Sequence, residues 1–595
     1  MSGSGALRVG VIAAAIALGT ANDTARAVAG VPTEVPRPWL PLAFSDNEYR
    51  MLGRRYDFGS RALPNQLVVG GVSLLAAPAR LKVALDGKRF DVRVVSVEAG
   101  VTSARSMSRR VRAKAGPVDL TQEMEIGFDG FVRVDTAIEG GAEHRLTEVS
   151  LSLPVAGVVA SSYSRYLDYD FNTQRADFAD LSSSAGEVPL DVDLHMSFNP
   201  AIWIGNETVG VELVTQTNAE RVLDQPERAH SLEGADGVVV LENRIVESTV
   251  GRTLERPLRF EFALFTTPAR PTASHRPPIS LVSSPRAGDR VDAFCEGELV
   301  EFHNWSMLPV EYPGLPAPVP TAGAARQYMQ SVAAAHAKDR RFIPYSSFYF
   351  LHGEVPIVRQ WVEGRPSPPA RRSPYWRSDD GGAEGVLQPV YYDDGLLREG
   401  VIEHHRDAAR RFALDGIYVD AAAPYENRAL EHFGRRRTVS GDRLAYYPMF
   451  SHRKLLQDYW SSLKSVNDGF LIVHHAPRVP RFAAAYADIV VVGEDLHRLF
   501  VDESAAVGSR YVPDYDALDP RFMEAVAHRN DAVRYTLLPQ IKKGTQVTPT
   551  EGRRLARRWT SSALRYAKHH GLGLWFARLD LDVARTFFSA PDRTC

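Results

Sequence analysis

The sequence predicts a multidomain protein in which an all-β supersandwich precedes a (β/α)8 TIM barrel. From residue 32 to residue 265, short alternating apolar runs are separated by turn residues, which is typical of a large β-sandwich. After residue 290, short apolar runs alternate with helical patterns, which indicates βα units and a parallel sheet. A chain of 595 residues has room for both, because sandwiches and barrels each run to about 250 residues.

Residues 1–31 resemble a signal peptide. Arg8 precedes an apolar run from Val9 to Leu18, and small residues then offer cleavage sites at Ala21 or Ala27. An Ala-rich leader is the alternative interpretation. The run is too short for a permanent membrane anchor, and no other segment approaches the length of a membrane span. We therefore expect a secreted or periplasmic protein with no membrane span.

Residues 32–265 contain two explicit hairpin turns, at Asp86-Gly87 and Asp129-Gly130. Each lies between apolar alternating runs and supplies residues that tolerate a positive φ. From residue 266 to residue 290 the chain is rich in Pro, Ser and Arg, so we expect a linker there. Residues 291–595 then form the predicted barrel.

Eight candidate strands follow the linker, which fits the size of a single barrel. They are Leu299–Asn304, Phe342–Phe348, Val386–Tyr392, Gly416–Asp420, Phe470–His475, Asp488–Glu494, Val533–Pro539 and Leu572–Ala577. Amphipathic helices lie between several of them, around Val332, Val401, Leu456 and Trp559. A doubly wound open sheet is the alternative, but no GxGxxG or P-loop pattern follows any of the strands, which disfavours its nucleotide-binding version.

The composition favours a neutral ligand. The formal charge is −2, so the chain lacks the basic excess that would attract nucleic acid, and a carbohydrate suits it at least as well. The two cysteines, Cys295 and Cys595, have neither CxxC nor Cys/His spacing. We therefore expect no metal site and no cofactor.

Asp420 is the strongest candidate for a catalytic group. In the strand Gly416–Asp420, Ile417 and Val419 alternate with Tyr418 and Asp420. If the two aliphatic residues pack on the helices, Asp420 points into the barrel mouth, where the C-terminal ends of the strands form the active site. Small residues follow it and leave room for a ligand, as a nucleophile requires. A helix cap or a partner for an Arg is the alternative role.

A second carboxyl group is expected at another strand end. Glu494 directly follows the apolar run of the sixth strand, and Asp495 is its immediate rival. Two neighbouring acids in a partly dry pocket push one pKa upward, as a general acid requires. A solvated loop carboxylate is the alternative interpretation of Glu494. Asp393, which follows Tyr392, is more typical of a residue that binds hydroxyl groups.

Several other strand-end residues are candidates for binding a substrate. Only one of His474 and His475 can face the mouth while both are extended, and neither has a third ligand at a metal-site spacing. A Trp at a strand end can stack on an apolar ring face, although core packing is the alternative. The candidates are His303, Trp305, Tyr392, Asp393, Tyr418, His474, His475, Asp495 and Tyr535.

Five segments in the first 270 residues resemble those of bacterial glycoside hydrolases related to family 123. They are Gly53–Phe58, Leu63-Pro64, Leu74–Pro78, Trp203–Glu207 and Phe265–Pro271, in the expected order. The resemblance implies a β-sandwich followed by a catalytic TIM barrel, and a glycosidase that acts on a carbohydrate.

The catalytic half departs from family 123, whose enzymes use an adjacent Asp-Glu pair, because Asp420 is followed by Ala421. An Asp after strand four with an acid after strand six instead resembles the retaining α-galactosidase and α-glucosidase clan. That resemblance implies that Asp420 is the nucleophile and Glu494 the acid/base of a retaining enzyme. A substrate-assisted β-N-acetylhexosaminidase and a non-catalytic carbohydrate-binding protein with a degenerate barrel are the alternatives.

Overall fold

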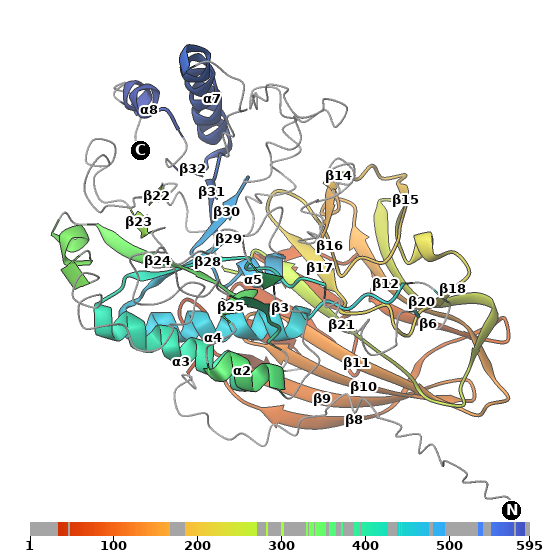
Figure 1. The fold of residues 1–595 in the computed structure, drawn as a ribbon. Coiled ribbons are helices and arrows are strands. Elements are labelled where there is room, and N and C mark those ends of the chain that lie inside the picture. The colour runs from red at the N-terminus through yellow and green to blue at the C-terminus, as the bar shows by residue number, and fades with distance from the viewer. Residues whose placement is uncertain are drawn as a thin grey trace, which may run out of the picture. The chain divides into compact units, whose positions relative to one another are not determined.

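The computed structural model of the chain (Figure 1) describes part of the sequence. The described residues are 34–45, 48–166, 185–270, 281–283, 299–302, 329–330, 332–337, 340–352, 356–363, 371–372, 386–392, 395–426, 437–438, 441, 443–474, 480–493, 533–539, 549–575 and 579–588.

The N-terminal half is built from sheets, as the alternating apolar runs predict. A nine-stranded sheet has the order β14-β13-β16-β17-β21-β11-β10-β9-β8, and a seven-stranded sheet has the order β15-β19-β20-β12-β6-β7. Side chains from both sheets, and from a small five-stranded sheet β1–β5, share one hydrophobic core. Alternate residues of long strands enter this core, so the two large sheets form a sandwich.

The strands of the sandwich have the following bounds. The five-stranded sheet contains β1 Ala43–Ser45, β2 Glu48–Met51, β3 Arg54–Asp57, β4 Gln66–Val69 and β5 Val72–Ser73. The seven-stranded sheet contains β6 Arg80–Leu85, β7 Lys88–Phe90, β12 Arg145–Ala156, β15 Asp193–Met196, β19 His230–Ala235 and β20 Val238–Thr253, with β18 Val222–Leu223 beside β20. The nine-stranded sheet contains β8 Arg93–Thr102, β9 Ser106–Ala115, β10 Val118–Gly127, β11 Val132–Glu139, β13 Ser162–Arg165, β14 Ala185–Glu187, β16 Ala201–Gly205, β17 Gly210–Val214 and β21 Leu258–Thr267.

Both predicted hairpins are present. Asp86 and Gly87 have φ values of 51° and 79° and join β6 to β7, which is the geometry of a two-residue turn. The second turn is longer than predicted, because β10 ends at Gly127 and β11 begins at Val132. Within it, Gly130 has a φ of 82°.

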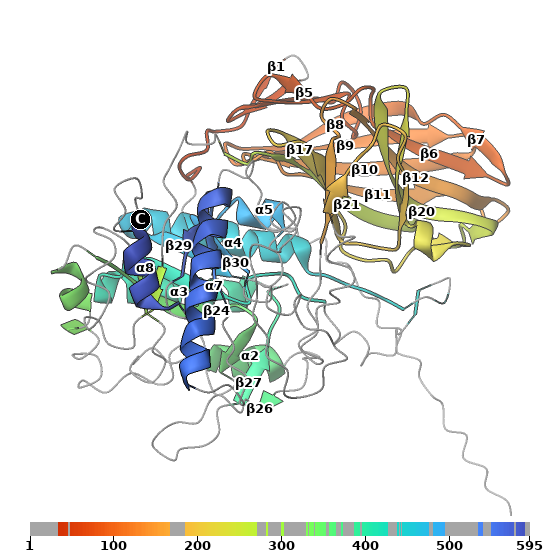
Figure 2. The ribbon, with the colours of Figure 1, turned by 90° about the horizontal axis from the view of Figure 1, so that it is seen from above.

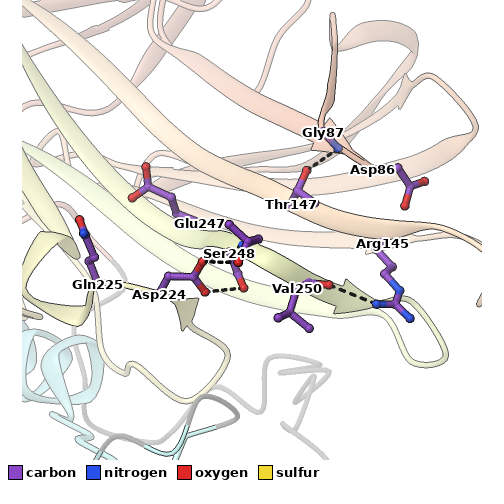
Figure 3. A pocket seen from close by; sticks show the side chains of 10 residues that line it. Asp86, Gly87, Arg145, Thr147, Asp224, Gln225, Glu247, Ser248 and Val250 are labelled. Carbon is purple, nitrogen blue, oxygen red and sulfur yellow. Dashed lines mark hydrogen bonds between the residues drawn. The ribbon is translucent and has the colours of Figure 1, made fainter.

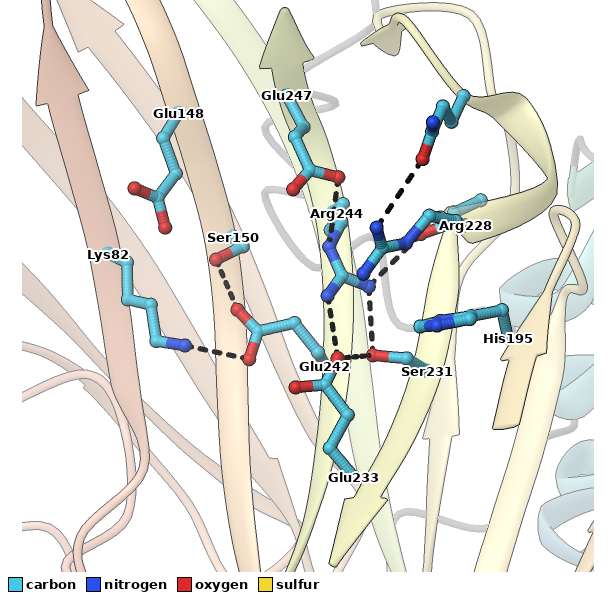
Figure 4. Close-up of polar contacts among 12 residues, drawn as sticks. Lys82, Glu148, Ser150, His195, Arg228, Ser231, Glu233, Glu242, Arg244 and Glu247 are labelled. Atoms are coloured by element: carbon cyan, nitrogen blue, oxygen red, sulfur yellow. Dashed lines mark hydrogen bonds and ion pairs between the residues drawn. The ribbon is translucent and has the colours of Figure 1, made fainter. Parts of the chain in front are cut away.

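Polar side chains link the strands of the seven-stranded sheet (Figure 4). Glu242 of β20 accepts hydrogen bonds from Lys82 of β6, at 2.9 Å, and from Ser150 of β12. Arg244, two residues further along β20, donates to Ser231 and Glu233 of β19 at 2.8 and 2.9 Å. These contacts satisfy buried polar groups that would otherwise destabilise the sheet.

The C-terminal half contains an eight-stranded parallel sheet. Its strands pair in the order of the chain: β22 Leu281–Ser283, β23 Leu299–Phe302, β24 Arg341–Ser347, β28 Gly416–Asp420, β29 Phe470–His474, β30 Ile489–Val492, β31 Arg534–Leu537 and β32 Gly573–Leu574. Neighbours are parallel throughout. No pairing of β32 with β22 occurs among the described residues, so the sheet is not shown to close into a barrel.

One predicted strand of this sheet is wrong, and one strand was missed. The segment 386–392 contributes β27 Val386–Pro389 to a separate antiparallel sheet with β25 Phe350–His352 and β26 Arg371–Arg372. The parallel sheet instead begins with β22, which lies inside the predicted linker. A short apolar run specifies a strand but not its partner, because the partner depends on tertiary contacts. The two errors cancel, so β28 is still the fourth strand.

Helices accompany the parallel sheet. They are α2 Pro356–Glu363, α3 Gly395–Phe412, α4 Met449–Asn467, α5 Arg481–Ala484, α7 Pro549–His570 and α8 Leu581–Phe588. Contacts join α2 to α3 and α3 to α4, and the three lie side by side in Figure 1; α7 and α8 do so in Figure 2. None of the described helices is long and apolar enough to cross a membrane.

The two faces of the parallel sheet pack in different hydrophobic clusters. Ile417 and Val419 of β28 belong to a cluster that contains several apolar residues of α3 and α4. Tyr418 belongs to a second cluster, together with Tyr345 of β24 and Ile472 of β29. The predicted alternation of β28 is therefore confirmed, and Asp420 shares the face of Tyr418.

Candidate active site

Asp420 is the last residue of β28, and its side chain is 36% exposed. One carboxylate oxygen, Oδ1, lies 3.1 Å from Nδ1 of His474 and accepts a hydrogen bond of 2.7 Å from the backbone amide of Ala421. The other oxygen, Oδ2, accepts a hydrogen bond from the hydroxyl of Tyr345. Three donors from two neighbouring strands and the following turn therefore fix both carboxylate oxygens.

These donors keep Asp420 ionised. Burial raises the pKa of the Asp420 carboxyl, but the hydrogen bond and charge of His474, the hydroxyl of Tyr345 and the amide of Ala421 outweigh it and lower the pKa to about 2. A carboxylate that is charged at neutral pH and partly exposed at a strand end can act as a nucleophile or stabilise a positive charge.

The backbone turns sharply after Asp420. Ala421 has a φ of 52°, in the left-handed region that non-glycine residues rarely adopt. The next amide, of Ala422, donates a 3.0 Å hydrogen bond to the carbonyl of His474. This turn directs the amide of Ala421 toward the carboxylate of Asp420.

His474 ends β29 and is 3% exposed. It lies beside Tyr418, with ring centroids 6.1 Å apart, and Tyr418 in turn stacks on Tyr345 at 5.3 Å and meets Trp575 edge-on at 5.3 Å. Aromatic rings thus pack beneath the carboxylate and restrict the positions of both of its side-chain donors.

The described residues hold only some of the predicted site. Asp420, Tyr418 and His474 come together on one face of the sheet. Tyr535 packs in the cluster of Ile417 and Val419, on the other face. The predicted residues Glu494, Asp495, His303, Trp305, Asp393 and His475 lie outside the described residues.

Tyr392 lies close to the turn that follows Asp420. It is buried, and its hydroxyl donates a 2.8 Å hydrogen bond to the carbonyl of Phe348. Phe348, Tyr391 and Tyr392 line a small pocket with Ala421 and Tyr425. The pocket therefore adjoins the turn that follows Asp420.

Tyr345 is the contact of Asp420 that the sequence alone did not predict. It stands in the middle of β24, two residues before Ser347, which is paired with Asp420. A position at a strand end does not identify Tyr345, because its long side chain reaches forward from the middle of the strand. The alternation of β24 was the available signal, since Tyr345 and Ser347 share one parity.

A separate polar hollow lies on the sandwich (Figure 3). Asp224 accepts a 2.7 Å hydrogen bond from Ser248 there, and Arg145 donates to the carbonyl of Val250 at 3.4 Å. None of the predicted site residues lines this hollow. In the described part of the chain, no group of three or more His, Cys, Asp or Glu residues is arranged to hold a metal ion.

Residues 42–227 match the family model described as glycoside hydrolase 123, third domain. The chain is a glycosidase, and the matched segment is related to glycoside hydrolase family 123. The matched segment lies within the sandwich and contains four of the five resembling segments, and the fifth, Phe265–Pro271, follows it. A search of the curated proteins gave no match to this glycoside hydrolase.

Among solved structures, this glycoside hydrolase is similar to the α-N-acetylgalactosaminidase NagBb from Bifidobacterium bifidum in its GalNAc complex. That match has 10% identity and a TM-score of 0.33, and it covers 84% of this chain and 85% of the other. A GH31 family sulfoquinovosidase from E. rectale matches at 11% identity, a TM-score of 0.38 and coverages of 91% and 81%. The α-galactosidase TtGalA from Thermus thermophilus matches at 12% identity with a TM-score of 0.36, and the match covers 76% of this chain and 91% of the other. Likenesses this distant do not bear on the substrate.

Proposed function

We propose that this protein is a retaining glycosidase in which Asp420 is the nucleophile and Glu494 is the acid/base. The observation that supports it is the carboxylate of Asp420, which is ionised, partly exposed and fixed by three donors at the end of β28. We further propose that the parallel sheet closes into a (β/α)8 barrel, whose mouth contains this carboxylate. The substrate is then an oligo- or polysaccharide met outside the cytoplasm.

The reaction has two steps. A carboxylate oxygen of Asp420 attacks the anomeric carbon while the glycosidic C–O bond breaks, and Glu494 gives its proton to the leaving oxygen. Water then attacks the same carbon, Glu494 takes a proton from that water, and the bond to Asp420 breaks. The donors around Asp420 hold its oxygens in place in the free enzyme, so little reorganisation precedes the attack.

The test begins with a screen of aryl glycosides, with and without a 2-acetamido group, on the full chain. On any substrate found, Asp420→Ala should lower kcat by about four orders of magnitude or more, since it removes the attacking atom. Azide should restore turnover in that variant and give a glycosyl azide of inverted configuration. Full activity of the variant on that substrate would refute the assignment, and a strict requirement for the acetamido group would favour substrate-assisted chemistry.

A further inference from the structure

We propose that His452 is a positioning residue for Asp420, and that the buried pair of Asp129 and Arg453 holds the helix that contains it. This inference rests on the proposed function, in which Asp420 is the nucleophile. It concerns a group that lies outside the strand ends, on helix α4, and an anchor that lies in the sandwich.

His452 is connected to Asp420 by a chain of hydrogen bonds through the turn that follows Asp420. Its Nε2 lies 3.1 Å from the carbonyl oxygen of Ala422, and the amide of Ala422 donates to the carbonyl of His474 at 3.0 Å. Nδ1 of His474 and the amide of Ala421 in turn contact Oδ1 of Asp420. His452 and His474 therefore hold Ala422 through its carbonyl and its amide.

The turn needs such a support, because Ala421 is in the left-handed region. For a residue with a Cβ that conformation costs about 1 kcal/mol, so the turn relaxes toward another conformation unless its surroundings hold it. If Ala422 shifts, the amide of Ala421 turns away from the carboxylate of Asp420. The position of His452 thus determines whether that donor reaches the nucleophile.

The chemistry of His452 suits this role. The ring is buried, and burial lowers its pKa to about 4 although the carbonyl of Ala422 favours the charged form. His452 is therefore neutral at neutral pH. Because a carbonyl oxygen only accepts hydrogen bonds, the Nε2 that faces Ala422 carries the proton.

Helix α4 is fixed by an ion pair with the sandwich. Asp129, in the turn between β10 and β11, is fully buried and pairs with Arg453, the residue after His452. Asp129 also accepts hydrogen bonds from the hydroxyl of Tyr486, at 2.5 Å, and the amide of Phe131, at 3.2 Å. The guanidinium of Arg453 lies 4.1 Å from the ring centroid of Phe131.

Asp129 and Arg453 form an ion pair in which both side chains are charged. Burial raises the pKa of Asp129, but Arg453, Tyr486 and Phe131 outweigh it, so the pKa is lowered overall. A buried ion pair contributes little net stability, yet it fixes one relative placement of the two groups. It therefore holds α4 where His452 reaches Ala422.

The test measures the pKa of Asp420 by 13C NMR on the full chain with labelled aspartate carboxyls, which requires no substrate. The signal of Asp420 is the one that Asp420→Asn removes, and its contacting titratable groups among the described residues are His474 and Tyr345. His452→Phe keeps a buried ring but has no donor, and we expect it to raise the pKa by about one unit. His452→Gln should stay near wild type, because its amide nitrogen can occupy the place of Nε2.

Two sandwich variants test the anchor. Asp129→Asn should raise the pKa of Asp420 in the same direction as His452→Phe, by a smaller amount. Glu212→Gln is the matched control, because Glu212 is also a buried sandwich carboxylate that contacts the parallel-sheet half, but at Arg481 and Phe482. It should leave the pKa of Asp420 unchanged.

The outcomes separate this inference from the proposed function. An unchanged pKa in a folded His452→Phe variant overturns the inference, as does an equal shift in Glu212→Gln. If His452→Phe does not fold, the pKa of Asp420 is compared between Asp129→Asn and Glu212→Gln. Equal pKa values in these two variants overturn the inference. On an active aryl glycoside, His452→Phe should lower kcat about tenfold with KM little changed and His452→Gln should restore it. The expected pKa shifts, together with full activity of Asp420→Ala, would refute the proposed role of Asp420 as nucleophile alone.

Discussion

Asp420 has donors on both carboxylate oxygens, from Tyr345, His474 and Ala421. The carboxylate is therefore held in its charged form and in one orientation, as a nucleophile requires before substrate arrives. The face of the sheet on which Asp420 lies could be predicted from the alternation of β28 alone. Its donors could not, because they depend on which strands are neighbours and on their register.

Removal of one donor should change the pH dependence of the enzyme. Tyr345→Phe deletes the hydroxyl that contacts Oδ2 of Asp420, so the pKa of the carboxyl should rise from about 2. Activity needs the ionised form and is lost as the pH falls through this pKa. The acid limb of kcat/KM should therefore move to higher pH, and its position is read from a rate profile.

The matched control is Tyr56→Phe. The hydroxyl of Tyr56 lies 2.6 Å from that of Thr266 in the sandwich, so this variant also loses a buried hydroxyl contact but has none with Asp420. Its acid limb should coincide with that of the wild type. Coincident limbs in wild type and Tyr345→Phe would show that Tyr345 does not tune the nucleophile.

At the scale of elements, the sequence predicts the strands of the parallel sheet better than their partners. Seven of its eight strands overlap predicted runs, whereas β22 was placed in a linker and β27 belongs to another sheet. The helices α3, α4 and α7 follow the apolar periodicity. Local patterns encode burial and period, but pairing arises from contacts between distant segments.

Helix α4 ends in a strained residue. Asp468 is its C-cap, with a φ of 55° in the left-handed region. Glycine adopts that conformation without steric cost, so Asp468→Gly should be more stable than Asp468→Ala by about 1 kcal/mol. Both variants lose the carboxylate, so their difference isolates the backbone effect. Thermal unfolding of the two variants measures it, and equal stabilities would contradict the strain.

At the scale of the whole molecule, sandwich residues take part in the core of the parallel-sheet half. Trp39, Phe131 and Phe265 belong to the cluster that contains the apolar residues of α4. The ion pair of Asp129 and Arg453 lies at the same contact. The sandwich thus contributes to the surroundings of the candidate site, which the sequence alone did not predict.

The buried histidines predict how stability changes with pH. His230 is 1% exposed, and burial, together with the charges of Arg221 and Arg244, lowers its pKa well below the usual value. The unfolded chain protonates this histidine near pH 6.5, but the folded chain does not. Below that pH the unfolded state binds more protons, so the free energy of unfolding decreases as the pH falls.

His230→Phe removes this contribution. The thermal unfolding midpoint of the variant should fall less than that of the wild type between pH 7 and pH 5. His404 and His452, whose pKa values burial also lowers, to about 4, remain in both proteins and cancel in the comparison. His195→Gln, at a partly exposed position, is the control. If the unfolding midpoints of wild type and His230→Phe fall equally between pH 7 and pH 5, His230 does not contribute to the pH dependence of stability.

In the proposed mechanism, Asp420 forms a covalent bond to the sugar. The most direct measurement is peptide mass spectrometry after inactivation with a 2-deoxy-2-fluoro glycoside of the sugar that the aryl glycoside screen identifies. We expect a fluoroglycosyl ester on the peptide that contains Asp420, formed in step with the loss of activity. A label on any other carboxylate, or inactivation without a label, would contradict it.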